Sequence, residues 1–244
     1  RRMTTRLPDY YRATVVPDDL SSRQCALCRA PVNVGYRFCF RCNAQAAAHP
    51  DLTGFVTYAL SGKQSGIEMH RYKDTRPSRQ ALSNVLALLK HGLSHLSCAG
   101  DLVGTPVEAV AVIPSRSHYQ ADAPSLLQRM CTRTLPDDMP LVDLRPKPGS
   151  ASDRHVRHDA FDVVTWPDAS HVMLIDDTWV TGATTLSAAA TLRASGARHV
   201  SVLVLARWLV PSFGPTREFL TAMRKHAWRN PQDVCPFTPD GTCP

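Results

Sequence analysis

Apolar and polar residues follow two periods along the chain, and each period predicts one kind of secondary structure. Short, nearly continuous apolar runs fit buried strands; they occur at about residues 55–60 and in "VEAVAVIPS", "PLVDL", "HVMLIDD" and "HVSVLVLAR". Apolar residues at helical spacing occupy residues 67–72 and 78–96, "APSLLQRMC", "TTLSAAATLRASG" and "TREFLTAMRKHAW". Ser78 is placed to cap the longest of these helices.

Strands and helices alternate from about residue 107 onward. Strands that are apolar on both faces are typical of parallel sheets covered by helices on both sides. The pattern therefore predicts an α/β fold with a mostly parallel sheet flanked by helices, over residues 51–230. We expect residues 1–24 to form a polar, poorly ordered lead-in and residues 231–244 a loosely ordered tail rich in Pro and Cys.

The composition excludes a membrane-spanning chain. It is 43% hydrophobic and 20% charged over 244 residues, which is ordinary for a globular protein with one sizeable core and a small module. No apolar run approaches the about 20 residues that a membrane helix needs, and the first residues lack the apolar core of a signal peptide. We expect a cytoplasmic protein with no membrane insertion.

Four cysteines near the beginning follow the spacing C-x2-C-x10-C-x2-C, and they are Cys25, Cys28, Cys39 and Cys42. Two C-x2-C pairs can place four thiolates around one Zn²⁺, and a segment this short has no core of its own. Residues 25–45 are therefore predicted to be a zinc-ribbon module with a structural Zn²⁺; a redox pair or an iron–sulfur site is the alternative.

The other four cysteines give weaker signals. Cys98 and Cys131 have the features of small buried residues. Cys235 and Cys243 lie in "CPFTPDGTCP", where they could join a second metal site, pair on oxidation, or belong to a free tail. We favour the free tail.

The formal net charge of +7 is unevenly placed. Residues 1–50 hold eight Arg and three Asp, which leaves them at +5. Such an Arg-rich segment favours contact with a polyanion or simply forms a solvated surface. Four thiolates around Zn²⁺ would remove about two of these charges.

The stretch "VMLIDDTWVTGATT", residues 172–185, combines an apolar strand, an acid pair and a hydroxyl-rich turn. We expect the strand to end at Ile175 and a helix to begin near Thr184 and Thr185. The N-terminus of a helix favours a phosphate, and Gly182 lets the backbone approach it. Carboxylates at Asp176 and Asp177 suit sugar hydroxyls. The combination predicts a site for a ribose 5-phosphate; an ordinary strand–helix turn is the alternative.

At these residues the sequence resembles the type I phosphoribosyltransferases, whose signature runs from a strand through two acidic residues to a T-G-x-T loop. The continuation "LRASGARHV" also resembles that family. The resemblance implies that Asp176 and Asp177 are the catalytic acid pair, holding the 2′ and 3′ hydroxyls of phosphoribosyl pyrophosphate (PRPP). It implies that the 5-phosphate is bound by Thr178, Trp179, Val180, Thr181, Gly182, Ala183 and Thr184.

A four-cysteine module ahead of such a domain resembles the ComF-type proteins of competence and DNA uptake. The segments "MHRYKD" (69–74), "AVIPSR" (111–116) and "SDRHVRHDAF" (152–161) are similar to theirs as well. The resemblance implies a pyrophosphate loop at Ser115 and Arg116, with Arg154 and Arg157 as loop cations. The chain departs from the family after Pro114, where it lacks an R-G-F-N-Q pattern.

Two functions follow from the resemblance. The first is an enzyme: Mg²⁺-dependent transfer of a phosphoribosyl group from PRPP to an unidentified acceptor, with His118, His155 and His158 as candidate bases. The second is a non-catalytic sensor of PRPP or a nucleotide. Its basic module would bind single-stranded DNA or a DNA-processing partner through Arg23, Arg29, Arg37 and Arg41.

Overall fold

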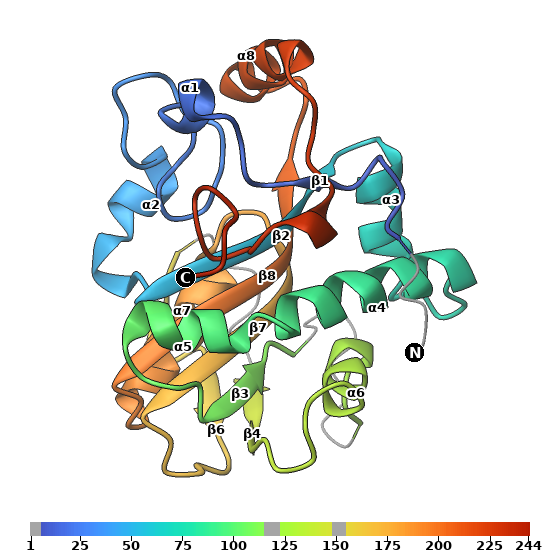
Figure 1. Ribbon diagram of the computed structural model, residues 1–244. Coiled ribbons are helices and arrows are strands. Elements are labelled where there is room, and N and C mark those ends of the chain that lie inside the picture. Colours follow the sequence, from blue (N-terminus) through green and yellow to red (C-terminus); the bar gives the residue numbers. More distant parts are fainter. Residues whose placement is uncertain (1–5, 115–122, 148–154) are drawn as a thin grey trace.

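The computed structural model describes residues 6–114, 123–147 and 155–244, and a six-stranded sheet lies at its centre (Figure 1). The strands follow the order β1-β2-β8-β7-β3-β4, and every neighbouring pair is parallel except β1 with β2. They are β1 (Arg12–Ala13), β2 (Leu52–Leu60), β3 (Ala109–Val112), β4 (Leu141–Val142), β7 (His171–Trp179) and β8 (His199–Leu209). The prediction of an α/β fold with a mostly parallel sheet is confirmed.

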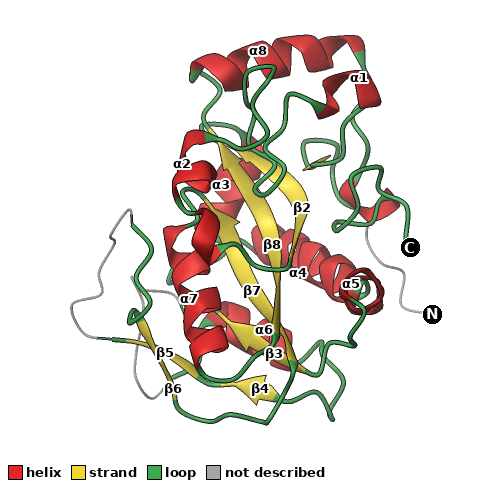
Figure 2. Cartoon of the chain, turned by 90° about the vertical axis from the view of Figure 1, so that its left-hand side faces the viewer, coloured by secondary structure: helices red, strands yellow, loops and turns green. Residues whose placement is uncertain are grey.

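Helices cover both faces of the sheet (Figure 2). One face packs Met173 and Ile175 against α3 (Gln64–Arg71), α4 (Arg79–Leu93), α5 (Leu96–Val103) and α6 (Leu126–Thr132). The other face packs Val172 and Leu174 against α7 (Ala183–Ala194). The remaining elements are α1 (Asp18–Ser21), α2 (Phe40–Ala44), α8 (Gly214–Ala222), the hairpin of β5 (Leu144–Pro146) and β6 (Phe161–Val163), and short 3-10 turns at Ala46–Ala48, Met223–Lys225 and Pro231–Asp233.

Ser78 caps α4 as expected, since its hydroxyl accepts a hydrogen bond from the Ala81 N–H. The expected helix over 78–96 is wrong in length, because α4 ends at Leu93. There Ser94 turns its hydroxyl back to the His91 carbonyl, and a second helix, α5, begins at Leu96.

The expected strand end at Ile175 is also wrong. β7 continues to Trp179, because β8 is long enough to pair with it beyond the acid pair, with Asp176 opposite Val204 and Thr178 opposite Ala206. α7 then begins at Ala183, slightly earlier than expected.

Residues 6–24 pack against the rest of the fold, so the expectation of a poorly ordered lead-in is wrong for them. Tyr11 is buried, and its hydroxyl donates to Glu68. β1 adds an antiparallel edge to β2. The expected loose tail is wrong too, because Val234, Cys235 and Phe237 are buried.

The four-cysteine segment shares the core of the α7 face. Cys25, Leu27 and Cys28 belong to the same buried cluster as Phe55 and Trp179. The Thr53 hydroxyl donates to the Leu27 carbonyl at 2.6 Å. The segment is therefore docked on β2 and β8 by backbone carbonyls of its first knuckle.

No helix among the described residues is both long enough and apolar enough to span a bilayer.

Candidate functional site

The carboxyl ends of β3 and β7 form the edge where a ligand is expected. These strands are neighbours, but β3 leads to α6 on one face of the sheet and β7 leads to α7 on the other. In open α/β sheets a crevice forms where connections diverge in this way. A cleft of about 300 Å³ lies there, lined by Tyr72, Lys73, Ile113, Pro114, Ser125, Leu126, Leu127, Asp176, Asp177, Thr178 and Thr184.

Asp176 points to the α7 face. It is buried, at 8% exposed, and its Oδ2 accepts a hydrogen bond of 2.6 Å from the Thr185 hydroxyl. Burial raises the pKa of this carboxyl from 3.8 to about 7, and the charge of Asp177 adds to the rise, while Thr185 and Lys73 oppose it. Asp176 therefore holds its proton to a much higher pH than an exposed carboxyl does.

Asp177 points to the opposite face, because successive side chains of a strand alternate. Its Oδ2 accepts a hydrogen bond of 2.5 Å from the Tyr72 hydroxyl and lies 2.9 Å from the Lys73 ammonium. This ion pair is partly buried. Two features thus relieve the repulsion between adjacent carboxylates: they lie on opposite faces, and Lys73 supplies a cation.

The turn after β7 has the conformation that its glycine permits. Gly182 has φ +84°, and a side chain there would overlap the buried Trp179 ring. α7 starts at the next residue, so the N–H groups of its first turn lack intrahelical acceptors. Thr184 lines the cleft, whereas Val180 is 55% exposed and Trp179 is turned into the core beside Phe55. The Trp179 side chain is therefore not available to a ligand in the cleft.

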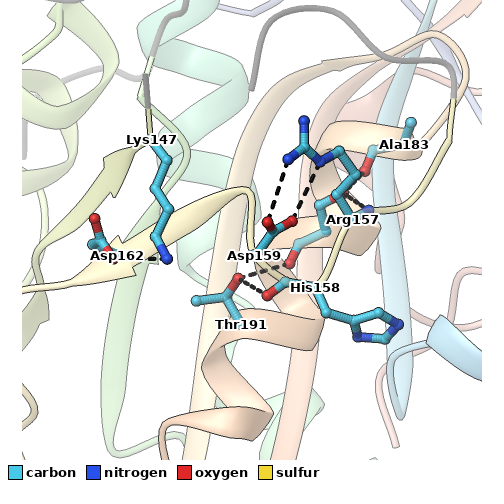
Figure 3. Close-up of polar contacts among 8 residues, drawn as sticks. Lys147, Arg157, His158, Asp159, Asp162, Ala183 and Thr191 are labelled. Atoms are coloured by element: carbon cyan, nitrogen blue, oxygen red, sulfur yellow. Dashed lines mark hydrogen bonds and ion pairs between the residues drawn. The ribbon is translucent and has the colours of Figure 1, made fainter. Parts of the chain in front are cut away.

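The segment that contains Arg157 and His158 lies against α7 and is hydrogen-bonded to it (Figure 3). The Arg157 N–H donates to the Ser187 hydroxyl, and the His158 carbonyl accepts from Thr191. The Arg157 guanidinium pairs with Asp159 at 3.3 Å. Ser115, Arg116, Arg154 and His118 lie outside the described residues.

His155 and His158 do not line the cleft. They line a separate hollow together with Phe40, Arg41, Ala44, Gln45, Ala47, Ala48 and Val156. Their expected role as bases gains no support from this position.

The four cysteines of the N-terminal segment converge. Their sulfur atoms all lie within 4.8 Å of one another, and those of Cys28 and Cys39 are 3.8 Å apart. A tetrahedron with metal–sulfur bonds of about 2.3 Å has sulfur–sulfur edges of about 3.8 Å. The cluster could therefore hold a metal ion, and its four thiols would fill a tetrahedral coordination sphere.

Arg207 of β8 connects this cluster to the turn after β7. Its buried guanidinium donates to the carbonyl of Cys28 at 2.8 Å and to the carbonyl of Trp179 at 2.8 Å. It also donates to the Cys28 sulfur at 3.7 Å. One side chain thus fixes both the first cysteine knuckle and the start of the Thr/Gly turn.

Sequence reasoning missed Tyr72, Lys73 and Arg207. Tyr72 and Lys73 lie in "MHRYKD", a segment that is similar to ComF-type proteins but to whose residues no function was assigned. Arg207 ends the apolar run "HVSVLVLAR". A charged residue inside an otherwise apolar strand was the available signal for Arg207.

Comparison with models of known protein families finds no match to this chain, and no curated protein matches it either.

Proposed function

We propose that the cleft binds PRPP or a related nucleotide that carries a ribose 5-phosphate. The observation that carries this proposal is that the acid pair and Thr184, in the first turn of α7, line one cleft at the divergence of β3 and β7. A carboxylate accepts from the hydroxyls of a ribose diol, and the first turn of α7 donates to a phosphate. Neither half alone would specify this ligand.

The two carboxylates have different parts in this proposal. Asp177 is oriented by Tyr72 and Lys73 and can accept from one hydroxyl without moving. Asp176 has a pKa of about 7, so a ligand hydroxyl that donates to it favours its ionised form. The hydrogen bond from the Thr185 hydroxyl of α7 fixes the orientation of the Asp176 carboxyl.

We further propose Mg²⁺-dependent transfer of the phosphoribosyl group to an unidentified acceptor. Carboxylate oxygens in the cleft are of the kind that Mg²⁺ prefers. When bound, Mg²⁺ would offset charge on the departing pyrophosphate. Lys73 is a second source of positive charge at the cleft, and the acid pair would favour positive charge developing on the ribose ring.

The four-cysteine cluster is proposed to hold a structural Zn²⁺. Its thiols saturate a tetrahedral ion, which leaves no open position for chemistry. Arg207 beside Cys28 would partly balance the negative charge of a zinc–tetrathiolate centre.

Isothermal titration with PRPP and Mg²⁺ tests the binding proposal, and release of pyrophosphate in the presence of candidate bases and amines tests transfer. Asp176→Asn with Asp177→Asn should abolish both signals. Asp162→Asn, on the β5–β6 hairpin away from the cleft, is the matched control and should leave both unchanged. Wild type that fails to bind PRPP contradicts the proposal; binding without turnover restricts it to sensing.

A second function is favoured by one observation on the cysteine module. Tyr36 and Phe40 are 66% and 88% exposed, and so they do not serve as packing around the metal cluster. Arg37, which lies between them in sequence, is exposed and can contact a phosphate. Arg29 is less suited to that role, because it is partly buried, and its burial lowers the pKa of its guanidinium. Exposed rings next to a cation can stack on the bases of single-stranded nucleic acid. We therefore keep binding of single-stranded DNA, coupled to PRPP or nucleotide sensing, as the alternative.

The alternative is tested by fluorescence anisotropy with a labelled single-stranded oligonucleotide at several salt concentrations. Phe40→Ala should weaken binding by about 1–3 kcal/mol, the usual range for one stacked base. Arg37→Gln should reduce the salt dependence. Val164→Ala, which truncates another half-exposed apolar residue, is the control. Equal affinity of all variants would exclude this surface as the contact.

A further inference from the structure

Four potential metal ligands from two distant segments meet at the beginning of α5. His95 and Cys98 lie at the start of this helix, and Cys235 and Cys243 lie in the C-terminal tail. The His95 Nδ1 and the three sulfur atoms are all within 4.8 Å of one another. Figures 1 and 2 both show the C-terminal end of the chain beside α5.

The distances fit a metal centre. Zinc bonds of about 2.3 Å to sulfur and about 2.0–2.1 Å to nitrogen, in a tetrahedron, place sulfur and nitrogen about 3.6 Å apart. The His95 Nδ1 lies 3.5 Å from the sulfur of Cys98 and 3.5 Å from that of Cys243. The first cluster, with its 3.8 Å separation between sulfurs, shows the corresponding all-sulfur geometry.

The tail is held in this position by contacts that involve none of the four ligand atoms. The His91 imidazole bonds to the Val234 carbonyl at 2.9 Å, and the Phe55 N–H donates to the Pro236 carbonyl. The Phe237 ring fills the space over Gly54, where a side chain would collide with it. The ligands are therefore brought together by the packing of the tail.

A turn within the tail brings its two cysteines to the same place. The Cys235 N–H donates to the Gly241 carbonyl at 2.8 Å, and Gly241 has φ +78°. Cys98 and Cys235 are buried, while Cys243 is exposed. The cluster thus has a protected interior and a side open to solvent through which an ion can enter.

From these contacts we propose a second metal site, a structural Zn²⁺ centre of the Cys₃His type formed by His95, Cys98, Cys235 and Cys243. Three thiolates and one imidazole are a donor set that selects zinc over hard cations. Four protein ligands close the coordination sphere, so the ion fastens the tail to α5 and performs no chemistry. Because the tail also bonds to the N-terminal segment, the ion restrains that segment as well: the Leu7 N–H donates to the Gln232 side-chain carbonyl at 2.7 Å, and Arg6 pairs with Asp233 at 2.9 Å.

Zinc content of the full-length chain, purified with a thiol reductant and without chelator, tests the proposal. Plasma mass spectrometry should find two zinc ions per wild-type chain. Cys243→Ser replaces an exposed residue, so the variant should fold, and it should retain one tightly held ion. Loss of a ligand should speed removal of the second ion by a weak chelator at least about 100-fold, since even outer-shell changes cost about 10–100-fold in affinity.

Cys131→Ala is the matched control. Among the described residues Cys131 is a buried thiol outside both clusters, so this variant should keep two ions. Cobalt substitution is an independent readout. The two clusters of wild type supply seven thiolates, four and three, so the thiolate-to-cobalt charge-transfer band of Cys243→Ser should lose about one seventh of its intensity.

Three results would overturn the proposal: a single zinc ion in wild type, a disulfide of Cys243 with Cys98 or Cys235 in place of the second ion, or equal zinc retention in wild type and Cys243→Ser. The test is independent of PRPP binding, which uses the other end of the sheet.

Discussion

The two adjacent carboxylates of β7 should respond to neutralisation with opposite signs. Asp176→Asn keeps the shape of the side chain and an oxygen that accepts from Thr185, but it removes a buried charge. Asp177→Asn instead removes the charge that pairs with the Lys73 ammonium and leaves the Tyr72 hydroxyl a neutral, weaker acceptor. We expect the first change to stabilise the folded protein at alkaline pH and the second to destabilise it.

The size of the first effect follows from the pKa of Asp176. Burial raises this pKa from 3.8 to about 7. The difference of about 3 corresponds to about 4 kcal/mol of folding free energy, at about 1.4 kcal/mol for each pKa unit. Asn gives up the charge-assisted part of the hydrogen bond from Thr185, which costs about 1 kcal/mol. The net gain for Asp176→Asn at pH 8 is therefore about 3 kcal/mol.

The pH dependence has a definite sign. A carboxyl whose pKa is raised in the folded state holds its proton more tightly there, so its contribution to stability is complete below pH 3.8 and is lost as the pH rises through 7. Wild type should lose this contribution between these values, and Asp176→Asn has no such proton to lose. The advantage of the variant should grow by about 2 kcal/mol between pH 5.5 and pH 8.

Urea unfolding followed by far-ultraviolet circular dichroism at pH 5.5 and pH 8 measures these differences. Asp177→Asn is the matched control, with an expected loss of about 1–3 kcal/mol from the lost ion pair and the weaker hydrogen bond. If Asp176→Asn is no more stable than wild type at pH 8, or if its advantage does not change with pH, the Asp176 carboxyl carries no raised pKa in the folded protein.

Three further predictions concern the surroundings of the acid pair. Thr185→Val removes the hydroxyl that donates to Asp176 and keeps the shape of the side chain, so the pKa of Asp176 should rise above 7. Titration of the carboxyl by NMR checks this, and an unchanged pKa would mean that the hydrogen bond does not favour the ionised form. Gly182→Ala places an alanine in the left-handed backbone conformation and its methyl group against the Trp179 ring, at a cost of at least about 1–2 kcal/mol for the backbone alone. The midpoint of thermal unfolding should therefore fall, and an unchanged midpoint would show that the turn can rearrange. Arg207→Met leaves the carbonyls of Cys28 and Trp179 without their donor, and zinc bound to the first cluster should be released faster to a chelator, an effect that Arg217→Met on α8 should not reproduce.

The sheet and most of its helices could be predicted from the sequence, because continuous apolar runs leave few alternatives to a buried parallel strand. Their boundaries could not. β7 extends past its apolar residues only because β8 offers partners as far as Arg207, and no local pattern contains that information. The break between α4 and α5 depends on one serine turning back to a carbonyl.

The acid pair and the Thr/Gly turn could be identified because they are contiguous in sequence. The groups that complete the site come from elsewhere in the chain: Tyr72 and Lys73 approach from the end of α3, and their sequence separation from Asp177 exceeds 100 residues. For the same reason, a second metal site at Cys235 and Cys243 was only an alternative from the sequence, and their approach to His95 and Cys98 could not be predicted. The two halves of this cluster are far apart in sequence, with His95 and Cys243 separated by 148 positions, and the packing of the tail brings them together.

The position of β8 has a consequence for how the chain matures during synthesis. β8 is the last strand made, yet it lies between β2 and β7 and is the only strand joining β1-β2 to β7-β3-β4 within the described sheet. At about 5–20 residues per second, a ribosome needs about 7–30 s to travel from the end of β2 to the end of β8. β2 lacks its β8 partner throughout that interval, and β7 lacks it from the time β7 is made, so each presents an unpaired edge of the kind that recruits other chains. A nascent chain stalled before β8 therefore lacks the middle of its sheet, and it should depend on chaperones until the ribosome passes Leu209.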